Sequence, residues 1–219
     1  MSSDSRAGQC FDAAHNVTTE AIIFLGELDP ENVGPGIEFA THYEATPVDD
    51  AKRLLAASPL APERTTFVDV GSGMGRVVFL AAQHPFRQIV GIEISPALHE
   101  VAKANSDRFP RDLLACSDVR LVRADAAGFT FPRGDLLVYL YNPFRAEVLK
   151  QMLENLIAGA SREVVILYHT PLECEAIEVR DAFDCIADLG FGRVYRLRRS
   201  SGAEVSRNNA IASRLSIAP

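Results

Sequence analysis

The glycine-rich stretch at residues 67–76 constrains the fold of this chain more than any other feature. It reads Phe-Val-Asp-Val-Gly-Ser-Gly-Met-Gly-Arg, so a strand rich in β-branched residues runs into three glycines, and an apolar helix is expected to follow. Glycines lack the Cβ atom that would hold a ligand away, and the free N–H groups at the start of the helix point at whatever binds there. The stretch therefore predicts a ligand pocket formed largely by backbone.

A second strand brings a carboxylate to that loop. Residues 88–93 form an apolar segment that ends in Glu93, 18 residues after Gly75. At the carboxyl end of a neighbouring parallel strand, such a side chain can accept hydrogen bonds from both hydroxyls of a ribose. The expected ligand is a nucleoside with a charged tail.

The spacing of the glycines separates two nucleoside cofactors. The dinucleotide fingerprint Gly-x-Gly-x-x-Gly needs a third glycine where this chain has Arg76, while Gly75 comes one place earlier and Asp69 stands two residues before Gly71. This Asp-x-Gly-x-Gly-x-Gly pattern resembles motif I of the class I S-adenosylmethionine-dependent methyltransferases. In that family the glycine loop turns around the methionine part of the cofactor, and the acid of motif I helps to fix the loop and the cofactor's ammonium end.

A third acid extends the resemblance. Asp125 closes an apolar segment that reads Ala-Asp-Ala at its end, 32 residues after Glu93. It is similar to the family's next motif, in which the carboxylate accepts from the adenine amino group, although the residue alone would also suit an ordinary turn. The resemblance implies the following cofactor-binding residues: Tyr43, Thr46, Asp69, Gly71, Ser72, Gly73, Gly75, Glu93, Ile94, Asp125, Ala126 and Asn142.

The catalytic candidates lie after a buried strand at 135–141. That strand opens into Asn-Pro-Phe at 142–144, which resembles motif IV, where the chain passes the transferable methyl group. Asn142 and Tyr141 are the implied catalytic residues, but the full Asn-Pro-Pro-Tyr form of the amino methyltransferases is absent. His169, at the end of the next strand, is interpreted as a structural histidine. No cluster with metal-ligand spacing is visible, so no metal is predicted.

Alternating strands and helices predict the fold class. The pattern is typical of an α/β protein with a Rossmann-like, doubly wound and mostly parallel sheet, whose ligand binds at the carboxyl ends of the strands. Strands are expected at 66–70, 88–93, 119–125, 135–141 and 163–168, and helices at 76–83, from Ser95 onward, and at 145–158. A helix at 172–183 should follow, and strands at 192–197 and near 211–217 should form a closing antiparallel pair.

The first 60 residues predict an N-terminal helical cap. A short helix is expected at 18–28, turns at 29–36, and a Tyr-x-x-Thr-Pro step at 43–47 before a further helix. That step is similar to bacterial methyltransferases with Tyr-Glu-Pro-Thr-Pro, themselves distantly similar to lysine methyltransferases. The resemblance implies a lid over the cofactor, and a fixed cap is the alternative. The expected organisation is an extension or lid at 1–60 and a cofactor-binding methyltransferase domain at 61–219.

Composition narrows the setting and the partners. The net charge of −7 opposes non-specific attraction to phosphate backbones, so a nucleic-acid acceptor is not expected. The apolar runs at 77–82 and 136–141 are far shorter than the roughly 20 residues that cross a membrane. Four cysteines without a Cys-x-x-Cys pair favour a reducing cytoplasm.

The sequence thus predicts a methyltransferase that uses S-adenosyl-L-methionine as its cofactor. Its acceptor is open, and a protein amine such as lysine ranks ahead of a small molecule. The alternatives are an NAD-dependent oxidoreductase, which Arg76 disfavours, and a non-catalytic cofactor-binding module. The sequence does not indicate the oligomeric state.

Overall fold

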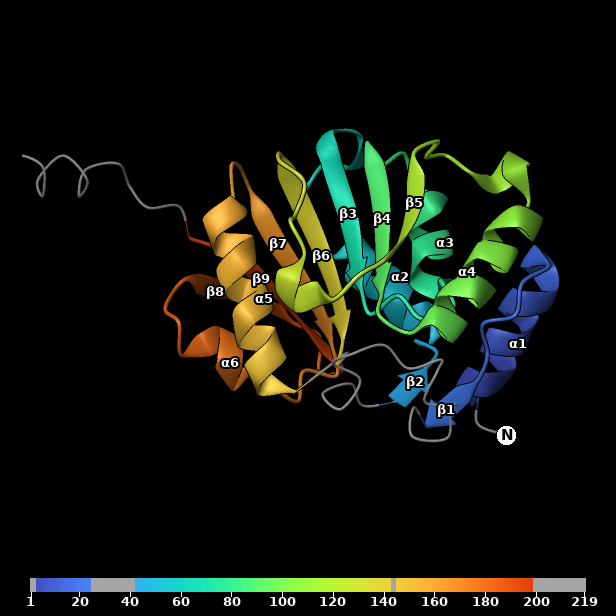
Figure 1. Cartoon of the computed structure of the whole chain (residues 1–219), viewed down its shortest axis with the longest axis horizontal. Coiled ribbons are helices and arrows are strands. Elements are labelled where there is room, and N and C mark those ends of the chain that lie inside the picture. Colours follow the sequence, from blue (N-terminus) through green and yellow to red (C-terminus); the bar gives the residue numbers. More distant parts are fainter. Residues whose placement is uncertain (1–2, 25–41, 143–144, 199–219) are drawn as a thin grey trace, which may run out of the picture.

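A seven-stranded sheet forms the centre of the molecule. The computed structural model describes residues 3–24, 42–142 and 145–198. The sheet has the order β5-β4-β3-β6-β7-β9-β8 (Figure 1). Strands β3 to β7 are parallel, whereas β9 runs against β7 and β8 against β9. The strands are β3 (Thr65–Val70), β4 (Gln88–Glu93), β5 (Val119–Arg123), β6 (Asp135–Tyr141), β7 (Val164–His169), β8 (Phe183–Asp188) and β9 (Gly192–Leu197). The doubly wound, mostly parallel sheet expected from the sequence is confirmed.

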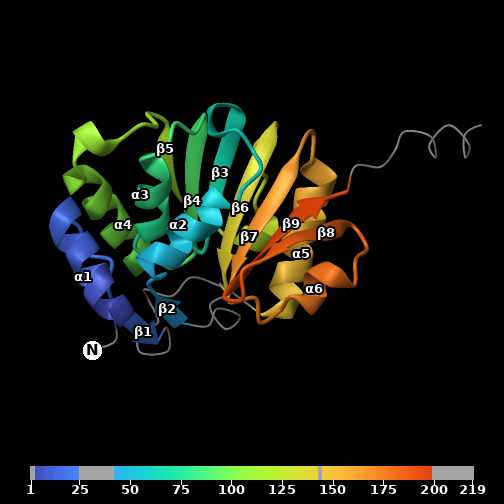
Figure 2. The same cartoon turned by 180° about the vertical axis from the view of Figure 1, so that it is seen from behind.

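Helices cover both faces of this sheet. On one face α2 and α3 pack against Phe67 and Leu137, and Figure 2 shows these two helices in front of the strands. On the other face α5 and α6 pack against Val68 and Val138. Neighbouring residues of one strand thus enter different halves of the core, as the pleat requires. The helices are α1 (Ser3–His15), α2 (Val48–Ala56), α3 (Arg76–Ala82), α4 (Pro96–Arg108), α5 (Ala146–Gly159) and α6 (Glu175–Glu178).

Local sequence explains where the helices near the glycine loop begin. The Ser95 hydroxyl accepts a hydrogen bond from the Leu98 N–H at 3.4 Å, and Pro96 occupies the first turn of α4. Helix α3 starts directly after Gly75, whose φ of 93° lies in the left-handed region that glycine adopts without strain. Both helix starts are at the positions that the sequence predicted.

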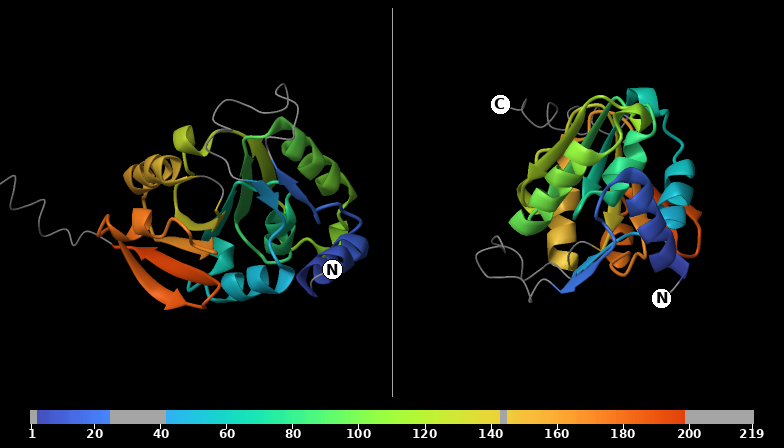
Figure 3. Two further views of the ribbon diagram at one scale, coloured as in Figure 1. Left: turned by 90° about the horizontal axis from the view of Figure 1, so that it is seen from below. Right: turned by 90° about the vertical axis from the view of Figure 1, so that its right-hand side faces the viewer.

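The N-terminal extension differs in part from its prediction. Residues 3–15 form α1, which the sequence did not predict. The prediction of a helix at 18–28 is wrong, because the described residues 18–24 are not helical. Instead β1 (Ile22–Phe24) pairs antiparallel with β2 (His42–Glu44), and Figures 1 and 3 place this ribbon across the carboxyl edge of the sheet. The Asp12 carboxylate accepts hydrogen bonds from the N–H groups of Thr19 and Glu20, so these N–H groups do not donate to carbonyls within a helix. The expected turns at 29–36 lie outside the described residues.

The predicted helix at 172–183 is also largely wrong. Only Glu175–Glu178 form a helix, and Phe183 begins strand β8. Leu172 and Val179 are 75% and 78% exposed, so the apolar residues of this segment do not share one buried face. Strand β8 is the antiparallel partner of β9, and the strand predicted near 211–217 lies outside the described residues.

Three absences hold for the described part of the chain. None of its helices is long and apolar enough to cross a membrane. No three His, Cys, Asp or Glu side chains within it are grouped to hold a metal ion. All four cysteines are free thiols.

The packing of α5 gives a prediction about stability. Leu156 is fully buried against the sheet, whereas Leu172 is exposed in the loop after β7. Leu156→Ala should lower the free energy of unfolding by about 2–5 kcal/mol, because a cavity remains where the side chain was. Leu172→Ala, the control, should change it by less than about 0.5 kcal/mol. Urea unfolding of both variants measures the difference, and equal effects would contradict this packing.

Candidate functional site

The glycine loop is held by the end of the neighbouring strand. The N–H groups of Gly71 and Ser72 both donate to the Ile92 carbonyl at 2.9 Å, and the Gly73 N–H donates to Glu93 Oε2 at 2.8 Å. Gly71 and Gly73 adopt φ values of 75° and 53°, a region that side chains with a Cβ rarely enter. The loop therefore turns tightly around the carboxyl ends of β3 and β4.

Glu93 is a buried carboxylate with two backbone donors. In addition to the Gly73 N–H, its Oε1 accepts the Ser95 N–H at 2.8 Å. Burial raises the pKa of Glu93, and its hydrogen bonds to backbone N–H groups oppose that rise. The glycine loop and the start of α4 are thus fixed relative to each other by one side chain.

Asp69 lies in the same buried region without such donors. It is 3% exposed, and among the described residues none donates a hydrogen bond to its carboxylate. Burial, and secondarily the nearby Glu93, raises the pKa of Asp69 to about 8. A cation or a hydrogen-bond donor placed beside this group would stabilise its ionised form.

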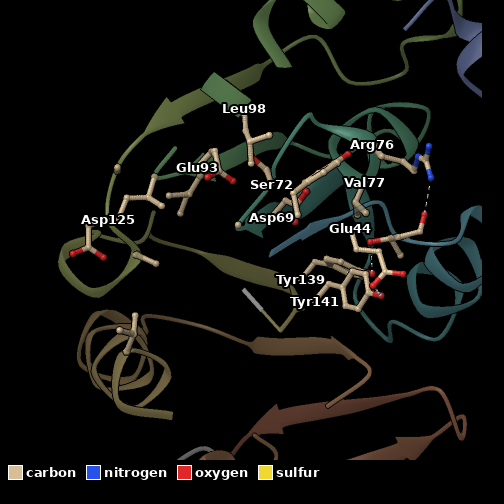
Figure 4. Close-up of a pocket in the computed structure, with 18 of the residues that line it drawn as sticks. Glu44, Asp69, Ser72, Arg76, Val77, Glu93, Leu98, Asp125, Tyr139 and Tyr141 are labelled. Carbon is tan, nitrogen blue, oxygen red and sulfur yellow. Dashed lines mark hydrogen bonds between the residues drawn. The ribbon is translucent and has the colours of Figure 1, made fainter. Parts of the chain in front are cut away.

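One cavity of about 220 Å³ joins these groups at the carboxyl edge of the parallel strands. Figure 4 shows Asp125 near one end, Glu93 and Asp69 in the middle, and Glu44 with Tyr141 towards the other end. Asp125 is exposed, and its Oδ1 accepts the Ala127 N–H at 2.9 Å. The following predicted site residues line the cavity together: Tyr43, Thr46, Asp69, Gly71, Ser72, Glu93, Ile94, Asp125, Ala126 and Tyr141.

Three predicted site residues lie beside the cavity without lining it. Gly73 is covered by the ring of Tyr43, which a Cβ at this position would meet, and a Cβ at Gly75 would come within 2.8 Å of Phe79. Asn142 has a φ of 37°, and its Oδ1 accepts the Leu172 N–H at 3.2 Å. The Asn142 amide oxygen is thus used to hold the loop after β7.

The segment that carries Tyr43 and Thr46 crosses the cavity. The Tyr43 hydroxyl donates to the Thr19 carbonyl at 2.5 Å, and its burial raises the pKa of Tyr43 well above the ordinary value. The Tyr139 hydroxyl donates to Thr46 Oγ1 at 3.3 Å, which ties the same segment to β6. The ring of Tyr43 therefore covers Gly73, and residues 42–46 are tied both to Thr19 and to strand β6.

Glu44 and Tyr139 are cavity residues that sequence reasoning missed. The Tyr141 hydroxyl donates to Glu44 Oε2 at 2.9 Å, and His42 Nε2 lies 3.4 Å from the same oxygen. The strand period of two was a usable signal for Tyr139, because it places residues 139 and 141 on one face. No local pattern marks Glu44, because its role depends on where the ribbon crosses the sheet.

The titration of the aromatic candidates limits their roles. Burial, and secondarily the bond to Glu44, raises the pKa of Tyr141 well above its usual range, so this hydroxyl stays protonated and donates. His169 is buried outside the cavity lining, with Nε2 3.2 Å from Asp50 Oδ2, and burial lowers its pKa. This placement fits its interpretation as a structural histidine.

Comparison with known proteins agrees with this geometry. The family model described as a methyltransferase domain matches residues 67–164, which include the glycine loop, Glu93 and Asp125. A trans-aconitate 2-methyltransferase from Methylobacterium radiotolerans is 35% identical over 100 residues, which are 45% of this chain and 34% of the relative. The chain thus matches about a third of the length of that curated relative.

Solved structures share the fold. TrmN from Thermus thermophilus superposes with a TM-score of 0.52 at 18% identity, over 68% of this chain and 48% of that one. The glycopeptide N-methyltransferase MtfA, complexed with S-adenosyl-L-methionine, superposes with a TM-score of 0.51 at 12% identity, over 68% and 92% of the two chains. The family match covers the glycine loop and the three cavity acids Asp69, Glu93 and Asp125, so this part of the chain is similar to methyltransferase domains, and the solved structures show that the chain shares their fold.

Proposed function

We propose that the cavity binds S-adenosyl-L-methionine and that the chain transfers its methyl group to an acceptor. The observation that carries this proposal is the row of three carboxylates, Asp69, Glu93 and Asp125, along one cavity beside the glycine loop. They match the cofactor's three polar parts in order: its ammonium group, its ribose hydroxyls and its adenine amino group. The S-adenosyl-L-methionine complex of a protein with the same fold supports this assignment.

Each carboxylate suits its part for a physical reason. Glu93 is already held by two backbone N–H groups, so its remaining lone pairs have a fixed direction towards a diol. Asp69 is buried, and a bound ammonium group would be its partner. Asp125 Oδ1 accepts the Ala127 N–H, which orients the carboxylate for an amino group at the exposed end.

In this proposal the chain's own residues mainly orient the two reactants and enclose them. When bound, the cofactor would supply a methyl group on a positively charged sulfur: the lone pair of a neutral acceptor bonds to the methyl carbon while the carbon–sulfur bond breaks and its electron pair stays on sulfur. Tyr43 and Thr46 line the cavity, and beside a bound cofactor they would take the place of water. Holding two reactants in line supplies a large part of the reduction in the barrier.

We further propose residues 1–60 as an extension or lid and 61–219 as the methyltransferase domain.

An amine is the acceptor that the far end of the cavity favours. Glu44 offers a carboxylate there, and Tyr139 and Tyr141 offer aromatic rings, a combination that attracts ammonium groups. An ammonium group held there loses a proton to solvent before its nitrogen can attack as the free amine. Among the described residues that line the cavity, Arg76 is the one Lys or Arg, and its guanidinium pairs with Glu20 at 2.8 Å. We rank a protein amine such as lysine first, and Tyr141 then orients Glu44 without acting as a base.

A small-molecule acceptor is the second candidate, since the curated relative is named for trans-aconitate. An NAD-dependent oxidoreductase and a non-catalytic cofactor-binding module remain the alternatives of other classes. The net charge of −7 continues to argue against nucleic acid. The cytoplasmic location stays a prediction from the cysteines.

The cofactor assignment predicts which ligands bind. The protein should bind S-adenosylmethionine and S-adenosylhomocysteine in calorimetry, but not NAD. Asp69→Ala and Glu93→Ala should each weaken binding by about 1–3 kcal/mol, because polar partners lose their bonds. Asp125→Ala should cost less, since a backbone contact to adenine remains. Asp188→Ala, on the exposed edge of β8, is the control. Binding of NAD alone, or three folded acid variants that bind like the wild type, would refute the assignment.

The raised pKa of Asp69 predicts how stability depends on pH. The folded protein keeps a proton on this group up to about pH 8, whereas the unfolded chain releases it near its ordinary pKa. Stability should therefore fall as the pH rises through the range between those values, because the unfolded state binds fewer protons there. Asp69→Asn should remove this part of the dependence. Thermal melting of the free protein from pH 6 to 9 measures it, and parallel curves for the two proteins would contradict the burial of this carboxylate.

The acceptor assignment predicts where label appears. Methyl-labelled cofactor and the protein, added to an extract of cells that lack this chain, should label a protein band. Glu44→Gln should abolish that label while S-adenosylhomocysteine affinity stays unchanged, because Glu44 serves the acceptor end. Glu100→Gln, an exposed pair with Lys103 on α4, is the matched control. Label in the small-molecule fraction would favour the second candidate, and S-adenosylhomocysteine binding without any turnover would favour the non-catalytic module.

A further inference from the structure

We infer that residues 18–20, which do not line the cavity, hold the glycine loop in its binding conformation and so determine cofactor affinity. This inference rests on the proposed function of the cavity. It assigns the N-terminal extension a role in the cofactor site through positioning residues that touch no ligand. Three side chains carry it, because each contacts both the 18–20 segment and the loop or its flanks.

The first is Arg76, the residue directly after Gly75. It is 3% exposed, its Nε donates to Thr19 Oγ1 at 2.8 Å, and its Nη1 pairs with Glu20 Oε2 at 2.8 Å. The same Nη1 donates to the Thr46 carbonyl at 3.3 Å. In Figure 4 the Arg76 guanidinium points away from Glu93 and Asp125. The start of α3 is thus anchored to the N-terminal extension by a buried cation.

The second is Asn105 on α4, which is fully buried. Its Nδ2 donates to the Thr18 carbonyl at 2.8 Å and to the Met74 carbonyl at 3.0 Å, and its Oδ1 accepts the Thr18 N–H at 2.9 Å. One amide therefore joins the 18–20 segment to the glycine loop itself. Removing the segment would leave this amide with unsatisfied groups in the interior, which is costly.

The third is Tyr43, which approaches from the other side. Its hydroxyl donates to the Thr19 carbonyl at 2.5 Å, and its ring lies where a side chain at Gly73 would be. The hydroxyl thus connects the segment to the ring that covers the loop. A shift of residue 19 would therefore move both Tyr43 and Arg76, and each of these contacts the glycine loop or the residue after it.

Asp12 fixes the segment in turn to α1. Its carboxylate accepts the Thr19 N–H at 2.6 Å, the Thr19 hydroxyl at 2.5 Å and the Glu20 N–H at 2.8 Å, and it lies 3.6 Å from Arg76 Nη2. Arg76 Nη2 is buried without a hydrogen-bond partner, so Asp12 acts on it through charge, while the hydrogen bonds of the network pass through Thr19. The Thr19 hydroxyl is the link between Asp12 and Arg76, so its removal is the most specific perturbation.

The test is Thr19→Val, with Thr19→Ser as the rescuing variant. Valine keeps the shape and removes the hydroxyl, whereas serine keeps the hydroxyl. Thr65→Val is the matched control, because Thr65 is equally buried and its hydroxyl donates to the Ala61 carbonyl at 2.8 Å, at the opposite end of β3. Thr19→Val should weaken S-adenosylhomocysteine binding about tenfold. Thr19→Ser and Thr65→Val should bind like the wild type.

Hydrogen exchange of the ligand-free proteins adds a readout that needs no cofactor. The amides of residues 71–75 should exchange faster in Thr19→Val than in the wild type and in Thr65→Val. A folded Thr19→Val with wild-type affinity and wild-type exchange overturns the inference. If Thr19→Val does not fold, Glu20→Gln decides in the same way by the same two measurements. A wild-type protein that binds no S-adenosylhomocysteine would refute the proposed function instead, while the exchange comparison would still test the positioning.

Discussion

The site depends on the hydrogen bonds between the Glu93 carboxylate and two backbone N–H groups. Gly73 and Ser95 donate to its two oxygens, so a single side chain at the end of β4 fixes both the glycine loop and the start of α4. A buried carboxyl group without such donors tends to keep its proton, as the raised pKa of the neighbouring Asp69 indicates. The register between β3 and β4, which pairs Asp69 with Gly91 and Val70 with Ile92, places Glu93 beside the loop. The geometry of the cavity follows from this register.

The N-terminal extension completes the site because a parallel sheet leaves its carboxyl edge open. The ribbon of β1 and β2 crosses that edge, and Tyr43 and Glu44 reach the cavity from it. The ion pair between the buried Arg76 and Glu20 connects this region to the start of α3. The N-terminal extension therefore forms part of the cavity wall.

Much of the fold was predictable because its signals are local. The glycine loop, the Ser95 cap and the apolar stripe of α5 each depend on residues close together in the sequence. Most of the predicted site residues line the cavity, largely because parallel strands end at a common edge. The helix predicted at 172–183 failed because its apolar residues do not form one buried face. Glu44 was missed because its position depends on a pairing between strands that are distant in the sequence, which no local pattern records.

The contact between Tyr43 and Gly73 restricts how this sequence can vary. Two features favour glycine at position 73: its positive φ, and the Tyr43 ring, which occupies the space where a Cβ would lie. A smaller residue at position 43 would free that space but would not change the backbone conformation. At Gly159 an added Cβ meets nothing within 4 Å. The two glycines therefore differ in the substitutions they tolerate, because a side chain at position 73 would both strain the backbone and displace the Tyr43 ring.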